Sequence, residues 1–78
     1  MENSDLTAIL GIITKTGGLA ELAPDQDFYD AGFTSVMALP LLMDLEDNFG
    51  VTIPDQDFIS ARTASALQAL IADIRTRN

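Results

Sequence analysis

The sequence predicts an all-α protein, a small four-helix bundle made of three main helices and one short helix. Apolar residues recur at helical spacing in three separate segments, and this periodicity is the primary signal of amphipathic helices. Aromatic residues make up only 6% of the chain and Trp is absent, which favours a core of Leu, Ile, Ala and Val over an aromatic-rich sheet. The 78 residues, 47% of them apolar, suffice for one packed domain, residues 1–78, and are too few for two.

The first helix is expected from about Ser4 to Thr16. Four apolar residues fall at positions i, i+3, i+4 and i+7 and therefore share one face: Leu6, Ile9, Leu10 and Ile13. Asn3 or Ser4 is expected to cap the N-terminus of this helix. Gly17-Gly18 is expected to end it, because glycine readily adopts the left-handed closing conformation.

A long connection, residues 17–34, follows the first helix. Four apolar side chains spaced along it are expected to anchor it on the core: Leu19, Leu22, Phe28 and Phe33. Within it, Pro24-Asp25-Gln26-Asp27-Phe28 recurs later as Pro54-Asp55-Gln56-Asp57-Phe58. Neither copy has the ligand spacing, mid-loop Gly and terminal Glu of an EF-hand. We therefore interpret the repeat as turn chemistry, with a Phe that pins each turn to the core.

The second helix is expected over residues 35–49, ends at Gly50, and has two apolar faces. At 100° per residue, one stripe faces the core: Ala38, Leu41, Leu42, Leu45 and Phe49. A second arc is bordered by Glu46 and Asp47 and contains Val36, Leu39, Pro40 and Met43. Either this helix is buried on both sides, or the second arc is an exposed protein-docking strip beside Ser35. In a domain with only three main helices, the second interpretation is favoured.

Two further helical segments complete the bundle. A short helical turn is expected over residues 55–59, after an extended link at residues 51–54. The last helix is expected to start after a Thr63 cap, and Arg75 and Arg77 suit its C-terminal end. Its apolar residues again have helical spacing: Leu67, Leu70, Ile71 and Ile74.

Cysteine and histidine are both absent, and the formal net charge is −8. Without them, disulfides, the commonest nucleophile–base pairs and nearly all transition-metal ligand sets are missing. We therefore expect no metal site and no catalysis by the chain alone. So acidic a surface repels phosphate backbones and anionic lipid, and is steered toward basic patches on other proteins.

No apolar run approaches the roughly 20 residues that a bilayer span needs, and the acidic start of the chain is unlike a signal peptide. We therefore expect a soluble, cytoplasmic monomer that binds neither nucleic acid nor membranes.

The stretch Asp30-Ala31-Gly32-Phe33-Thr34-Ser35-Val36 resembles the phosphopantetheine attachment motif of acyl and peptidyl carrier proteins, usually Asp-x-Gly-x-Asp-Ser-Leu. The segment 45–54 is similar to the end of that family's second helix and the loop that follows, and the resemblance extends over essentially the whole chain. It implies an acyl-carrier-protein-like fold with a 4′-phosphopantetheine arm attached covalently to Ser35. Asp30, Gly32 and Thr34 would then belong to the attachment motif.

Physical chemistry agrees with this resemblance. A serine at a helix N-terminus presents its hydroxyl to solvent, and the free N–H groups of the first turn favour a phosphate there. Gly32 permits a positive φ just before the helix. Asp30 is expected either to cap locally or to approach the magnesium ion of the modifying transferase. The simpler alternative is that Ser35 is only a helix-capping residue.

Four residues depart from the family pattern: Thr34 replaces Asp, Val36 replaces Leu, and Met37 and Pro40 stand where an acid and a Glu are common. Thr34 can still cap. If it does, Pro40 removes one helical hydrogen bond, to the Val36 carbonyl, and Pro40→Ala is expected to stabilise the fold by up to about 3 kcal/mol. The more apolar second helix indicates a dedicated partner rather than ordinary fatty-acid synthesis.

The leading hypothesis is a non-catalytic carrier that holds an acyl or aminoacyl group as a thioester on the arm of Ser35. Among the family, free-standing aminoacyl carrier proteins are one match for this chain. Its partners would be a phosphopantetheinyl transferase, an acyl- or amino-acid:carrier-protein ligase and a downstream acyltransferase. The alternative is an unmodified acidic interaction module that docks through Val36, Leu39 and Met43. A domain of a larger assembly-line enzyme is less favoured, because the chain begins with Met1.

Overall fold

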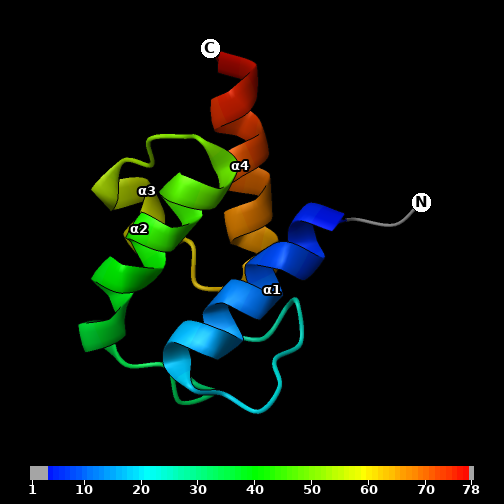
Figure 1. The fold of residues 1–78 in the computed structure, drawn as a ribbon, viewed down its shortest axis with the longest axis vertical. Helices are drawn as coiled ribbons and strands as arrows, with labels where there is room; N and C mark the ends of the chain where they lie inside the picture. The colour runs from blue at the N-terminus through cyan, green and yellow to red at the C-terminus, as the bar shows by residue number, and fades with distance from the viewer. Residues whose placement is uncertain (1–3, 78) are drawn as a thin grey trace.

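The computed structural model describes residues 4–77, and this part of the chain contains helices and no strands. The α-helices are α1 (Ser4–Gly17), α2 (Ala38–Phe49), α3 (Asp55–Ser60) and α4 (Ala64–Arg77). A 3₁₀ turn, η1 (Ser35–Met37), directly precedes α2. Three long helices and one short helix confirm the predicted fold class (Figure 1).

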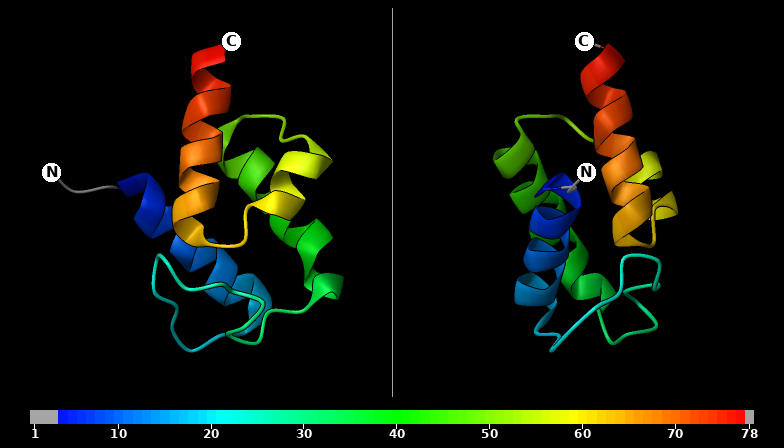
Figure 2. Two further views of the ribbon diagram at one scale, coloured as in Figure 1. Left: turned by 180° about the vertical axis from the view of Figure 1, so that it is seen from behind. Right: turned by 90° about the vertical axis from the view of Figure 1, so that its right-hand side faces the viewer.

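The hydrophobic core lies where α1 packs against both α2 and α4, and α3 lies at one side of α2 (Figure 2). The predicted apolar stripes supply it. Its fully buried aliphatic residues come from these three long helices: Ile9, Ile13, Leu41, Leu45, Leu67 and Ile71. The predicted positions Leu6, Leu10 and Leu70 are partly buried and pack against this cluster. The periodicity therefore identified the buried face of each long helix.

Glycine closes both α1 and α2. Gly18 has φ of +66°, and the Leu19 amide donates back to the Thr14 carbonyl at 2.9 Å, which is the bonding of a Schellman motif. Gly50 closes α2 with φ of +63°, and its amide donates to the Glu46 carbonyl at 2.9 Å. The ends predicted at these glycines are thus confirmed, with α1 one residue longer than expected. Asn3 lies outside the described residues.

The start of α4 is capped as predicted. The Thr63 hydroxyl accepts a hydrogen bond from the Ala66 amide at 3.0 Å, which satisfies one of the first free donors of the helix. At the other end, Arg75 pairs with Asp5 of α1 at 3.0 Å and lies over the Phe49 ring of α2 at 5.1 Å. This arginine therefore joins the three long helices.

The connection 18–34 has no regular helix and is held by its aromatic residues. Phe28 and Phe33 are buried, while Leu19 and Leu22 are partly buried, so all four predicted anchors contact the core. The Phe28 and Phe33 rings meet edge to face, 5.2 Å apart, a favourable aromatic geometry. The loop is thus packed against the bundle at its centre and at its end.

The two copies of the five-residue repeat form different local structures. The first is a turn, because the Asp27 carboxylate accepts hydrogen bonds from the Tyr29 and Asp30 amides at 2.8 and 3.2 Å. The second opens α3, with Pro54 immediately before its first residue. The phenylalanine of each copy is buried, as predicted. Within residues 4–77, no cluster of three acidic residues is arranged to hold a metal ion.

The first turn of the second helical stretch differs from the prediction. Residues 35–37 are 3₁₀, and α2 proper begins only at Ala38, which makes Pro40 the third residue of an α-helix. An amide at that position has no acceptor within its helix, so its absence costs little. The proline ring also disfavours an α-helical carbonyl four residues earlier, at Val36, which accounts for the 3₁₀ turn. The expectation that Pro40→Ala stabilises the fold by up to about 3 kcal/mol assumes a Thr34 cap and a hydrogen bond to the Val36 carbonyl, and this turn requires neither.

Substituting two glycines of α1 tests the packing between this helix and the end of the connection. A Cβ on Gly17 would lie 2.5 Å from Phe33 Cδ1, and Phe33 is buried, so Gly17→Ala should lower the free energy of unfolding by about 1–3 kcal/mol. Gly11 is exposed and has open space around it. Gly11→Ala should therefore raise stability by about 0.5–1 kcal/mol. Urea unfolding measures both, and equal effects of the two substitutions would contradict the contact.

Candidate functional site

Ser35 lies where the long connection meets the second helical stretch, and it is exposed. Thr34 before it is extended (φ −103°, ψ 156°), and its side chain makes no capping hydrogen bond, so the side-chain cap expected from Thr34 is not formed. The Met37 amide donates to the Thr34 carbonyl at 3.0 Å. The amides of Ser35 and Val36 have no protein acceptor within residues 4–77. Two N–H donors are therefore free beside the exposed hydroxyl.

The preceding residues of the motif place Ser35. Gly32 has φ of +115°, in the region that favours glycine, as predicted. The next residue, Phe33, is buried, and its amide donates to the Phe28 carbonyl at 2.9 Å. Asp30 is exposed, and its carboxylate makes no hydrogen bond or ion pair within the described part of the chain, although its charge adds to the effects that raise the pKa of Arg62. The loop thus turns at Gly32 and is held in the core by Phe33, and Ser35, two residues later, is exposed to solvent.

The second arc of α2 and η1 is exposed. Val36 is 83% exposed, Leu39 63% and Met43 57%; we call these three residues the apolar strip. Pro40 lies between them and is also exposed. Of the two interpretations of this helix, the structure therefore supports an exposed apolar face rather than burial on both sides.

The two acidic residues predicted to border this strip differ in their surroundings. Asp47 is exposed. Glu46 is half-buried, and its Oε2 accepts a hydrogen bond from the Ile53 amide at 2.9 Å. Glu46 therefore holds the loop after α2, a structural role that sequence analysis did not identify.

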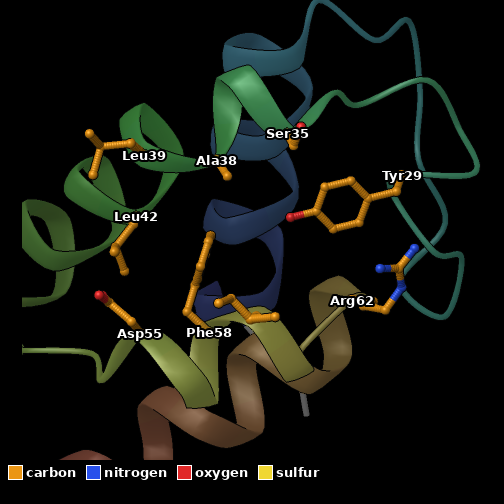
Figure 3. Close-up of a pocket in the computed structure, with 9 residues that line it drawn as sticks. Tyr29, Ser35, Ala38, Leu39, Leu42, Asp55, Phe58 and Arg62 are labelled. Carbon is orange, nitrogen blue, oxygen red and sulfur yellow. The ribbon is translucent and has the colours of Figure 1, made fainter.

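A groove of about 520 Å³ runs beside Ser35, between α2 and α3; we call it the α2–α3 groove. Ala38, Leu39 and Leu42 of α2 line one wall and Phe58 of α3 the other (Figure 3). Ile59 of α3 also lines the groove. Its polar lining residues are Tyr29, Ser35, Asp55 and Arg62. In Figure 3 the Tyr29 hydroxyl points into the groove below Ser35. The volume and the mainly apolar walls are those of small-molecule sites.

Arg62 forms one end of this groove and ties it to the long connection. Its Nε donates to Asp27 Oδ2 at 2.6 Å, its carbonyl accepts from the Phe28 amide, and its guanidinium lies 4.6 Å from the centre of the Tyr29 ring. The hydrogen bond from Arg62 is the main reason that the pKa of Asp27 is lowered, and the same bond raises the pKa of Arg62. Sequence analysis did not single out Arg62 or Tyr29. The only available signal was that Asp27 lies in the repeat.

An exposed serine that opens the second helical stretch of a small bundle, with free amides beside it, is the arrangement expected of a helical carrier domain. The family model described as "Phosphopantetheine attachment site" matches residues 5–71, and the chain belongs to this family of carrier proteins. Domains of this family carry covalently attached 4′-phosphopantetheine. The resemblance noted in the sequence is thereby confirmed.

One curated relative is described as "Probable acyl carrier protein" from Caulobacter vibrioides (strain NA1000 / CB15N). It is 40% identical over 48 residues, which are 62% of this chain and 56% of the relative. The match thus spans little more than half of that protein's length. Separately, no helix within residues 4–77 is long and apolar enough to cross a membrane.

The residues present fit a phosphopantetheine group. Attachment requires a reachable hydroxyl, which Ser35 has, and the phosphate would meet the two free amides of the turn. When bound, the group supplies a thiol that forms thioesters. The chain itself has no cysteine and could not supply one.

The Asp27–Arg62 contact generates a test by pH. Because the pKa of folded Asp27 lies below its ordinary value, its contribution to stability is present above that value and is lost as pH falls below it. As the pH is lowered from about 6 to about 3, the free energy of unfolding should therefore fall less in Asp27→Asn than in the native protein. Asp25→Asn is the control, since Asp25 is exposed and belongs to the same repeat. Urea unfolding at each pH measures the slopes, and identical slopes for Asp27→Asn and the native protein would refute this role.

Proposed function

We propose that Ser35 is the attachment residue, and that the protein carries an acyl or aminoacyl group as a thioester on the arm it bears. The observation that carries the proposal is the exposure of Ser35 at the start of η1, beside two free amides and after the turn at Gly32. Asp30 and Thr34 precede this position and are exposed, where a modifying enzyme can contact them.

The modification is a phosphoryl-type transfer to the serine oxygen. Ser35 Oγ forms a bond to the phosphorus of the phosphopantetheine moiety of coenzyme A, the pyrophosphate bond breaks, and 3′,5′-ADP leaves. The hydroxyl proton passes to the transferase or to solvent. In the product, the Ser35 and Val36 amides would face phosphate oxygens and offset the cost of a further negative charge on an acidic protein.

The enzymes that act on this protein are proposed to dock on the apolar strip. A phosphopantetheinyl transferase, a ligase that loads the thiol and a downstream acyltransferase must all reach the same Ser35. Val36, Leu39 and Met43 extend from that residue along one face, with Pro40 among them and Asp47 beyond. Apolar contact would supply affinity and the acids would orient a basic partner surface. The protein is thus a substrate of these enzymes and performs no catalysis itself.

The attachment site is tested by mass spectrometry. Incubation with coenzyme A and a broad-specificity phosphopantetheinyl transferase should add one phosphopantetheine to the native protein and none to Ser35→Ala. Ser60→Ala is the matched control, because Ser60 is another exposed helical serine, and its hydroxyl donates to the Gln56 carbonyl. It should be labelled like the native chain. Labelling of Ser35→Ala, or an unchanged mass of the native protein, would overturn the proposal.

The docking strip is tested by transferase kinetics. Met43→Glu puts a charge into an apolar contact, which should raise the KM for the carrier about tenfold or more if that contact contributes about 1.4 kcal/mol. Ala69→Glu is the control: Ala69 is exposed but lies on α4, outside both the strip and the α2–α3 groove. Far-UV circular dichroism checks that both variants fold. A KM that rises equally in both variants would show that the strip is not the docking face.

A further inference from the structure

Two charged side chains line the α2–α3 groove, and they differ in whether they already have a partner. Arg62 is paired with Asp27 at 2.6 Å and lies over the Tyr29 ring. Asp55, the first residue of α3, is exposed, and its carboxylate makes no hydrogen bond or ion pair within residues 4–77. The groove therefore presents a neutralised cation and an unpaired carboxylate.

The positions of these groups follow the groove. In Figure 3, Arg62 and Tyr29 lie at one end, Asp55 lies near Leu42 and Phe58 at the other, and Ser35 stands above Tyr29. An arm attached to Ser35 thus begins at the Tyr29 end. If it runs along the groove, its cargo passes between apolar walls toward the Asp55 carboxylate.

We propose that the α2–α3 groove selects a cargo that carries an ammonium group, as an aminoacyl group does, and that Asp55 accepts the hydrogen bond from this ammonium. The inference rests on the proposed attachment at Ser35 and specifies the class of cargo. The carbon skeleton of the cargo would contact Ala38, Leu42 and Phe58, and its ammonium would reach the one charge in the groove that has no partner.

The other two classes of cargo fit the groove less well. An acyl group with a free carboxylate would approach Asp55 in a chain with a net charge of −8, and the only cation in the groove is already paired with Asp27. A neutral acyl group would contact the apolar walls but would partly desolvate Asp55 without compensating its charge. Only a cation both complements the carboxylate and is favoured by the overall field.

The test compares two cargoes of the same shape. Coenzyme A analogues that carry alanyl or isobutyryl through an amide in place of the thioester resist hydrolysis, and they differ only in an ammonium where the other has a methyl group. A broad-specificity transferase attaches each to the native protein, to Asp55→Asn and to Asp57→Asn. Asp57 belongs to the same repeat and helix but does not line the groove, so it is the matched control.

Backbone amide shifts of residues 55–60, followed by NMR, report how much of the cargo lies in the groove. For an exposed ion pair, the ratio of docked to free arm should be about twofold to fivefold higher for alanyl than for isobutyryl. This preference should vanish in Asp55→Asn and persist in Asp57→Asn. Equal shifts for the two cargoes on the native protein, or a preference that survives in Asp55→Asn, would overturn the inference while leaving attachment at Ser35 intact. Failure of both analogues to attach to the native chain would instead remove the proposed function, and this inference with it.

Discussion

The contact between Phe33 and Gly17 fixes the position of the candidate attachment residue. Phe33 is 2% exposed and approaches the end of α1 so closely that a Cβ on Gly17 would lie 2.5 Å from its ring. This contact ties the last turn of α1 to the residue that lies two positions before Ser35. A long loop without regular structure can therefore deliver one side chain to a defined place, because its end is packed as tightly as a core helix.

The long helices could be predicted from the sequence because their apolar residues are periodic and because Gly18, Gly50 and Thr63 mark their ends. The 3₁₀ turn at Ser35 could not, since it depends on a steric effect of Pro40 that acts across four residues. The Asp27–Arg62 pair joins residues 35 positions apart, and no local pattern indicates such a contact. The exposed serine and the apolar strip were predictable from the pattern of one helix. The groove was not, because it depends on how α3 packs against α2, which no local pattern indicates.

The few basic residues determine which carboxylates are paired within the fold and which remain available to bind other molecules. Arg62 neutralises Asp27 and Arg75 neutralises Asp5, each across a distance in sequence that joins separate parts of the fold. Both cations are therefore used for structure. Within residues 4–77, the acids whose carboxylates make no hydrogen bond or ion pair include Asp55 in the groove and Asp30 in the loop before Ser35. Charge that holds the fold together is thus separated from charge that can meet a ligand or a partner enzyme.

The internal repeat shows this division within one five-residue sequence. In the first copy, the fourth residue, Asp27, is used for a turn and for Arg62, and its phenylalanine anchors the long connection. In the second copy, the same sequence opens a helix, which turns its first carboxylate, Asp55, toward the groove while Phe58 is buried beneath it. The same five residues therefore stabilise the fold in the first copy, whereas in the second copy they leave the Asp55 carboxylate available in the groove. Because Arg62 is bound to the first copy, the second copy keeps an uncompensated negative charge in the groove that Ser35 also lines.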